Sequence, residues 1–129
     1  MPFSHYLSEA ILNHVLRNTA HTSPATVYLS LATSLGSAGS IFVEPSTGGY
    51  ARQAIAFGAP SGRTVLNSGS TVSFPAPTTP WGPITHVGVH DAVSAGNLLF
   101  YKLLNASITT ATSMVVQVEV GSLSIAIDP

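Results

Sequence analysis

PATVYLSL, residues 24–31, decides how the rest of the chain is interpreted, because its apolar and polar side chains alternate. In an extended strand, Val27, Leu29 and Leu31 would point to one face, and the side chains between them would point to the other. The period is two residues, not the 3.6 residues of a helix. The stretch therefore predicts a half-buried β-strand that begins after Pro24.

Further strands are expected downstream, over residues 50–57, 71–74, 84–90, 98–104, 114–120 and 123–127. Turn-forming segments separate them, and Gly121-Ser122 predicts a hairpin between the last two strands. No helical pattern lies between successive strands, which excludes a doubly wound parallel fold. We therefore predict a mainly β fold, an antiparallel β-sandwich or jelly roll with one N-terminal helix.

The N-terminal helix is predicted over residues 4–17. Leu7, Ile11 and Val15 recur with the period of an amphipathic helix, and Ser4 is placed to cap the first turn. Arg17 would lie in the last turn, where a cation interacts favourably with the helix dipole. We expect this helix to pack on one face or end of the sheet, within a single domain that spans residues 1–129 and has strands from about residue 25 to 127.

Few side chains carry charge. Charged residues make up 7% of the 129 residues, against roughly 25% in a typical soluble domain, while 45% are hydrophobic. With 17 Ser and 13 Thr, hydroxyl groups must cover much of the surface that faces water. The formal net charge is only -1, so copies of the chain do not strongly repel one another. We expect association with copies of itself, as a dimer or trimer, or burial in a larger assembly.

Composition excludes several kinds of partner and site. The four basic residues, Arg17, Arg52, Arg63 and Lys102, are scattered, whereas a nucleic-acid surface needs a basic patch. No Cys is present, which excludes disulfides, thiol catalysis and Cys-based zinc sites. The N-terminus lacks a cationic region, and no apolar run approaches the roughly 18 residues that span a membrane. We expect no nucleic-acid partner, no secretion signal and no membrane anchor.

His86, His90 and Asp91 form the only compact group that resembles a metal or acid–base site. Strand residues four positions apart share a face but lie about 13 Å from each other, too far to ligate one metal ion. Asp91 is typical of a turn that follows the strand. His14 would lie beside the apolar stripe of the helix. We expect structural or surface roles for all four residues.

No other pattern indicates catalysis or a bound cofactor. With 17 Ser, composition leaves a Ser-His-Asp triad open, but the nucleophile pattern G-x-S-x-G does not occur. The five carboxylates include no close pair in the sequence, although glycosidase carboxylates can come from distant segments. No Walker-type phosphate-binding sequence is present. We predict that the protein is not an enzyme and has no catalytic, cofactor-binding or metal-binding residue.

Three side chains and one loop are candidates for contact with partners. Arg52 and Lys102 interrupt apolar strands, where a cation can pair with a carboxylate, protect an edge strand or contact a neighbouring subunit; we favour the last two roles over catalysis. Trp81, in a Pro- and Gly-rich turn, could stack on a sugar or plug the end of the sandwich, and we favour the plug. Residues 36–49 are predicted to form a long loop around the apolar island Ile41-Phe42-Val43, and long loops often bind partners.

Motifs along nearly the whole chain carry a family resemblance. GGYARQ at residues 48–53 is the most specific; it is preceded by LSEAILNH at 7–14 and PATVYLSL at 24–31, and followed by WG at 81–82, ITH at 84–86, DA at 91–92 and GNLLFY at 96–101. Together they resemble a family of small bacteriophage virion proteins commonly labelled tail-fibre-like. The resemblance implies a virion component, assembled in the host cytoplasm, without a catalytic site.

Three hypotheses follow from these observations. The favoured one is a capsid decoration or cement protein that binds the major capsid protein, because the chain carries little charge and, with a radius of gyration of about 14 Å, is no long fibre by itself. The second is a tail-fibre or tail-associated receptor-binding module, which contacts tail proteins and a host surface glycan. The third, remote hypothesis is an envelope-polysaccharide hydrolase. The candidate contact surface consists of Tyr50, Arg52, Trp81, Ile41 and Phe42.

Overall fold

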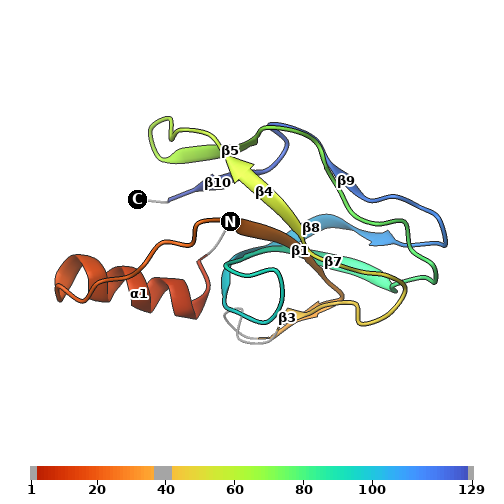
Figure 1. Cartoon of the computed structure of the whole chain (residues 1–129), viewed down its shortest axis with the longest axis horizontal. Coiled ribbons are helices and arrows are strands. Elements are labelled where there is room, and N and C mark those ends of the chain that lie inside the picture. The colour runs from red at the N-terminus through yellow and green to blue at the C-terminus, as the bar shows by residue number, and fades with distance from the viewer. Residues whose placement is uncertain (1–2, 37–41, 128–129) are drawn as a thin grey trace.

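The structure, a computed structural model, describes residues 3–36 and 42–127. Within these ranges one helix, α1 (His5–Leu16), is followed by short strands (Figure 1). The strands are β1 (Val27–Ala32), β2 (Ser34–Leu35), β3 (Phe42–Val43), β4 (Gln53–Phe57), β5 (Thr64–Ser68), β6 (Val72–Ser73), β7 (Pro83–His90), β8 (Leu98–Thr109), β9 (Gln117–Val118) and β10 (Ser124–Ala126). Among the described residues, no helix is long and apolar enough to cross a membrane.

Six strands form one antiparallel sheet in the order β10-β5-β4-β1-β7-β8. This sheet curls into a half-barrel (Figure 1), and two small sheets, β2-β3 and β6-β9, accompany it. One hydrophobic core joins the large sheet to β6-β9, because Leu29 and Ile84 are buried together with Val72 and Phe74. The predicted mainly β, antiparallel fold with one N-terminal helix is confirmed.

β1, the strand predicted from residues 24–31, lies between β4 and β7 and is buried on both faces. Leu29 and Leu31 enter the core as expected. On the opposite face Ser30 is 0% exposed, and its hydroxyl lies 2.8 Å from Nδ1 of His90. The ring of Phe42 meets the His90 ring edge-on, with centroids 5.2 Å apart. The expectation of a half-buried strand is therefore wrong, because His90 and the β2-β3 hairpin cover its polar face.

α1 matches the predicted cap but not the predicted burial. Oγ of Ser4 accepts a hydrogen bond from the Leu7 amide at 3.1 Å, and the Ser4 amide donates to the carbonyl of Leu99 in β8 at 2.7 Å. Leu7 is buried, whereas Val15 and Leu16 are 68% and 74% exposed. The helix packs on β8 through its first turns and then extends beyond the sheet (Figure 1). Its second half therefore leaves apolar side chains exposed, contrary to the expected stripe ending at Val15.

The prediction of a C-terminal hairpin around Gly121-Ser122 is wrong. β9 pairs with β6, and β10 pairs with β5, a strand that the sequence pattern did not predict. Asn67 of β5, only 2% exposed, holds the connection between β9 and β10. Its Oδ1 accepts a hydrogen bond from the Leu123 amide and its Nδ2 donates to the Glu119 carbonyl, both at 2.9 Å. A buried side-chain amide thus replaces the hydrogen bonds that a hairpin would have made.

Residues 36–49, expected to form a long loop, contain the short strand β3. β3 pairs with β2 as an antiparallel hairpin, in which Ser34 lies opposite Val43 and Leu35 lies opposite Phe42. Residues 37–41, and with them Ile41, lie outside the described residues. Phe42 and Val43 therefore belong to a small sheet, whereas residues 36 and 44–49 lie outside the strands, as expected. The segment positions Phe42 and Glu44 over β1 and β7.

Candidate functional site

The turn before β4 is built by two glycines of the GGYARQ motif. Gly48 and Gly49 have φ values of +73° and +79°, in the left-handed region that favours glycine. A Cβ at Gly48 would lie 2.6 Å from the carbonyl oxygen of Thr79 and 2.9 Å from Cδ1 of Trp81. The Gly48 carbonyl accepts a hydrogen bond from Nε1 of Trp81 at 3.1 Å. The turn therefore depends on glycine at position 48 and fixes the Trp81 ring beside it.

Tyr50 links this turn to the centre of the sheet. Its hydroxyl donates to Oε1 of Glu44 at 2.6 Å and accepts a hydrogen bond from the Leu31 amide of β1 at 3.0 Å. Its ring stacks on Phe74 with centroids 6.1 Å apart and meets Trp81 edge-on at 5.4 Å. Burial, and then the hydrogen bond to Glu44, raise the pKa of Tyr50 above its ordinary value. The phenol therefore stays protonated and acts as a fixed donor.

Arg52 and Glu44 form an ion pair that also holds the loop between β7 and β8. Nη2 and Nε of Arg52 donate to the two carboxylate oxygens at 2.7 and 2.9 Å, and Nη1 donates to the carbonyls of Ala92 and Ala95, both at 2.8 Å. The Arg52 side chain is 8% exposed and that of Glu44 is 21% exposed. Burial alone would raise the pKa of Glu44, but hydrogen bonds from Arg52 and Tyr50 and the charge of Arg52 outweigh burial and lower it. Glu44 is therefore ionised at neutral pH.

His90 lies at the end of β7, beside the ion pair, and is 5% exposed. Burial, and then the charge of Arg52, lower the pKa of His90 to about 4, so its ring is neutral at neutral pH. A serine within hydrogen-bond distance of a histidine is the first requirement of a catalytic triad. Ser30 meets that requirement but is 0% exposed, so its hydroxyl has no access to a substrate. The Ser30–His90 hydrogen bond joins β1 to β7 and has a structural role.

Asp91 begins the turn between β7 and β8, as predicted. Its carboxylate accepts hydrogen bonds from the backbone amide and the side-chain amide of Asn97, at 2.7 and 3.0 Å. His86 lies four residues back along β7, and its Nδ1 is 2.8 Å from the hydroxyl of Thr85. Within residues 3–36 and 42–127, no group of three or more His, Asp or Glu side chains is placed to hold a metal ion. His86, His90 and Asp91 each have a hydrogen-bond partner within the chain, and their structural role stays a prediction.

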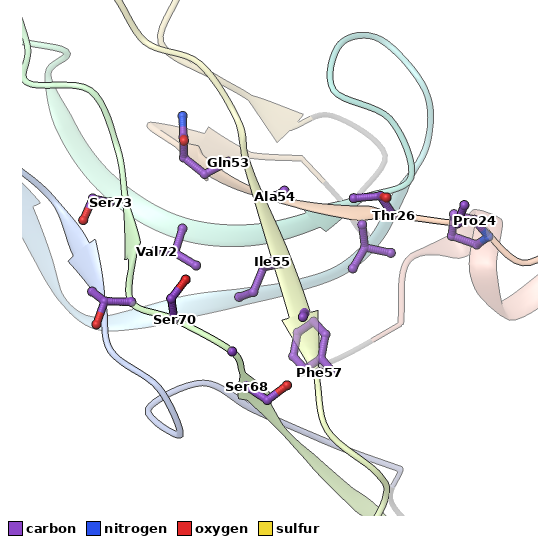
Figure 2. Close-up of a pocket in the computed structure, with 15 residues that line it drawn as sticks. Pro24, Thr26, Gln53, Ala54, Ile55, Phe57, Ser68, Ser70, Val72 and Ser73 are labelled. Atoms are coloured by element: carbon purple, nitrogen blue, oxygen red, sulfur yellow. The ribbon is translucent and has the colours of Figure 1, made fainter.

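A groove of about 800 Å³ lies between β4 and the segment 68–73 (Figure 2). Ile55 and Val72 are buried and form its apolar floor. The polar side chains that line it are all hydroxyls or amides, from Thr26, Gln53, Ser68, Ser70, Thr71 and Ser73, and no lining side chain is charged. The sequence did not identify this groove, because Ser and Thr occur throughout the chain and only the fold brings Thr26 and Gln53 beside the segment 68–73.

Comparison with known proteins identifies the family. A family described as Podophage GP4 fiber I protein gp80 matches residues 2–126. The chain belongs to this family. It is therefore a phage fibre protein and a component of the virion, and the resemblance to phage virion proteins is confirmed. The family supports the tail-fibre hypothesis better than capsid decoration. No curated protein matches the chain.

The described residues of the contact surface expected on the fibre protein are partly or largely buried, and two of them, Phe42 and Arg52, line a small pocket beside His90. The Arg52 side chain is 8% exposed and Trp81 is 6% exposed, so both lie largely inside the fold. Tyr50 is partly buried with its hydroxyl bonded to Glu44, and Phe42 is partly buried against His90. Ile41 lies outside the described residues. The four described residues contribute mainly to the packing around β1.

The two cations expected on strands of the fibre protein have different roles. Lys102 is exposed on β8, which is an edge of the six-stranded sheet. The pairing of β8 with β7 also changes register just beyond Leu103. A charge and an irregularity both discourage an edge strand from pairing with another sheet, so edge protection fits Lys102. For Arg52 the first of the three expected roles is confirmed, because this side chain pairs with the carboxylate of Glu44 inside the fold.

Proposed function

We propose that this protein is a non-enzymatic component of the phage tail fibre that holds a host-binding surface at the tail. The observation that carries the proposal is the family match, which covers residues 2–126 and describes a fibre protein. Nothing in the fold specifically favours capsid decoration over a place in the fibre. We therefore adopt the tail position as the working hypothesis.

The contacts of the polar residues support a non-enzymatic role. A catalytic group needs access to a substrate and an arrangement suited to the reaction. Here Ser30 is buried, and the three guanidinium nitrogens of Arg52 all donate to acceptors of the same chain. Among the described residues, every buried side-chain nitrogen or oxygen has a hydrogen-bond partner. These groups stabilise a rigid scaffold, which is what a binding module requires.

The size of the domain supports a terminal or connecting position in the fibre. A chain of this length has a radius of gyration of only about 14 Å, too small to form an extended shaft alone. Other virion proteins are therefore the expected partners. Association with copies, as a dimer or trimer, stays a prediction, and α1 offers the surface on which to test it. Leu12, Val15 and Leu16 there are 56%, 68% and 74% exposed.

Electron cryomicroscopy of the virus particle tests the tail position directly. The expected result is density for this fold on the tail and none on the head. Density at symmetry-related capsid sites would establish decoration and overturn the proposal.

Host binding is tested with the purified chain. Cells incubated with an excess of it should adsorb phage more slowly, because the free protein occupies the receptor. A heat-denatured sample of the same chain is the control. If adsorption is unchanged although the protein is present on the tail, the protein is a fibre component that does not itself contact the host.

A further inference from the structure

The groove beside β4 lies where the pairing between β4 and β5 ends. β4 and β5 pair where Ala56 lies opposite Ser68 and Phe57 lies opposite Asn67. At Gly69, the residue that follows Ser68, φ is +86°, a conformation that only glycine adopts readily. The chain then leaves β4 and continues into β6, which pairs with β9. The groove occupies the space into which β5 would otherwise have extended.

Because this pairing ends, the backbone of Ala54 has no strand partner on the groove side. In an antiparallel ladder, successive residues direct their N–H and C=O groups to alternate sides. The Gly58 amide donates to the Leu66 carbonyl at 3.0 Å, so even-numbered residues of this stretch face β5. Ala54 therefore directs its N–H and C=O into the groove. There, in the described ranges, the β4–β5 pairing has already ended.

The chemistry of the groove is uniform. Hydroxyls and the amide of Gln53 can each donate and accept hydrogen bonds, as can the backbone of Ala54. Beneath them Ile55 and Val72 present an apolar floor, and the ring of Phe57 also lines the groove. None of the lining side chains is charged, so the groove provides no ion-pair partner for an ionic ligand. Its volume of about 800 Å³ lies within the usual range for ligand sites.

We propose that this groove binds a neutral saccharide. Sugar hydroxyls both donate and accept, which matches Thr71, Ser70 and the Ala54 backbone, and the C–H faces of a sugar ring can pack on the apolar floor. The inference rests on the proposed host-binding function, for which it names the site and the ligand class. The groove takes the place of the contact surface expected around Tyr50 and Trp81, because the hydrogen-bonding groups of the groove are accessible.

An extended peptide fits this groove less well. A peptide inserted as a strand between β4 and β6 would need them about 9.5 Å apart, twice the spacing of neighbouring strands. Some Cα atoms of β4 and β6 lie within 8 Å of each other. A strand therefore cannot enter without separating the core around Ile55 and Val72, whereas a sugar can rest on its surface.

The test uses the purified full-length chain and a panel of immobilised oligosaccharides. Neutral members contain glucose, galactose, rhamnose or N-acetylglucosamine, and charged members contain sialic or uronic acid. Ser70→Arg should weaken binding of a neutral member at least about tenfold by filling the groove. Thr71→Val removes one hydroxyl at similar volume and should weaken binding about threefold to tenfold. Ser107→Arg, at an exposed serine outside the groove, is the matched control and should leave binding unchanged.

Circular dichroism and thermal unfolding confirm that each variant is folded. Absence of binding to every neutral sugar, preference for the charged members, or binding that Ser70→Arg does not change would each overturn the inference. Capture of extended peptides that Ser70→Arg abolishes would assign the groove to a peptide instead. If the protein is on the tail and blocks adsorption but binds no panel member, only the saccharide inference fails. If it is on the capsid, the proposed function fails, and the panel still tests the groove.

Discussion

Replacing Arg52 with Met should destabilise the fold strongly, although the residue lies just before β4 and its sequence position alone does not show that it is buried. Methionine keeps much of the aliphatic stem but loses the charge and every donor. Glu44 would then retain only the Tyr50 hydroxyl, and the carbonyls of Ala92 and Ala95 would lose their shared donor. The perturbation thus leaves a carboxylate, 21% exposed, without its counter-ion.

The magnitude follows from that burial. Breaking a fully buried pair by removing one partner costs about 3–5 kcal/mol. Because Glu44 keeps some contact with water, we expect about 2–4 kcal/mol for Arg52→Met, equivalent to roughly 10 °C in Tm for a chain of this size. The same substitution at Arg63, an exposed residue, should change stability by less than about 0.5 kcal/mol. The difference between the two variants isolates the ion pair from the general effect of losing a positive charge.

Urea unfolding followed by circular dichroism measures both variants, together with Glu44→Gln and the double variant Glu44→Gln/Arg52→Met. The double variant has no unpaired carboxylate, so it should be more stable than the sum of the single losses predicts. A loss for Arg52→Met within about 1 kcal/mol of the loss for Arg63→Met would refute the reasoning and reduce the pair to a surface contact. Strictly additive losses would show that the two side chains do not interact.

Four further outcomes are expected. Asn67→Ala leaves the buried amide of Leu123 without its acceptor and should cost about 2–4 kcal/mol in urea unfolding, while a loss under about 1 kcal/mol would contradict the role of Asn67. Burial lowers the pKa of His90 from its ordinary 6.5 to about 4, so between these pH values the unfolded chain binds the extra proton. Stability should therefore be full above pH 6.5 and fall by up to about 3 kcal/mol towards pH 4, and His90→Gln should remove most of this slope above pH 5. Leu16→Glu, at a side chain 74% exposed, should reduce the mass seen by light scattering without lowering Tm, and an unchanged oligomer would exclude α1 from the interface. Saccharide affinity should change less than about twofold between 0.05 and 1 M NaCl, because no lining side chain is charged; a steep decrease would indicate an ionic ligand.

The sequence predicted those elements whose local pattern agrees with their final environment. The apolar and polar residues of β1 alternate, which predicted a strand there although both of its faces are buried, and the helix has both the apolar period and the Ser4 cap. β5 was missed because Leu66 is exposed while Asn67 is buried, the reverse of what polarity suggests. The exposed end of α1 was also missed, because an amphipathic pattern shows that one face is apolar but not whether this chain or a partner covers it.

The site was harder to predict than the fold, for a physical reason. GGYARQ was singled out as the most specific motif of the family resemblance, but its tyrosine and arginine give no sign of whether they face solvent or another part of the chain. The partner of Arg52 is Glu44, which lies across the turn from it, and its other acceptors are backbone carbonyls of Ala92 and Ala95 about forty residues away. Backbone acceptors have no sequence signature, so this network becomes visible only in three dimensions.

The groove likewise has no sequence signature, but its chemistry is related to the composition of the chain. An unpaired strand edge normally invites other chains to pair with it. Here the open edge is short, since β4 pairs with β5 from Ala56 onward, and hydroxyl side chains along the segment 68–73 can hold water over it. A chain with only nine charged residues has few other means of keeping such an edge hydrated. Charged side chains in the groove would have favoured ionic ligands over a neutral one. The abundance of Ser and Thr therefore serves two purposes at once: it keeps a weakly charged surface hydrated, and where Gly69 opens the sheet it supplies the hydrogen-bonding groups that a neutral sugar requires.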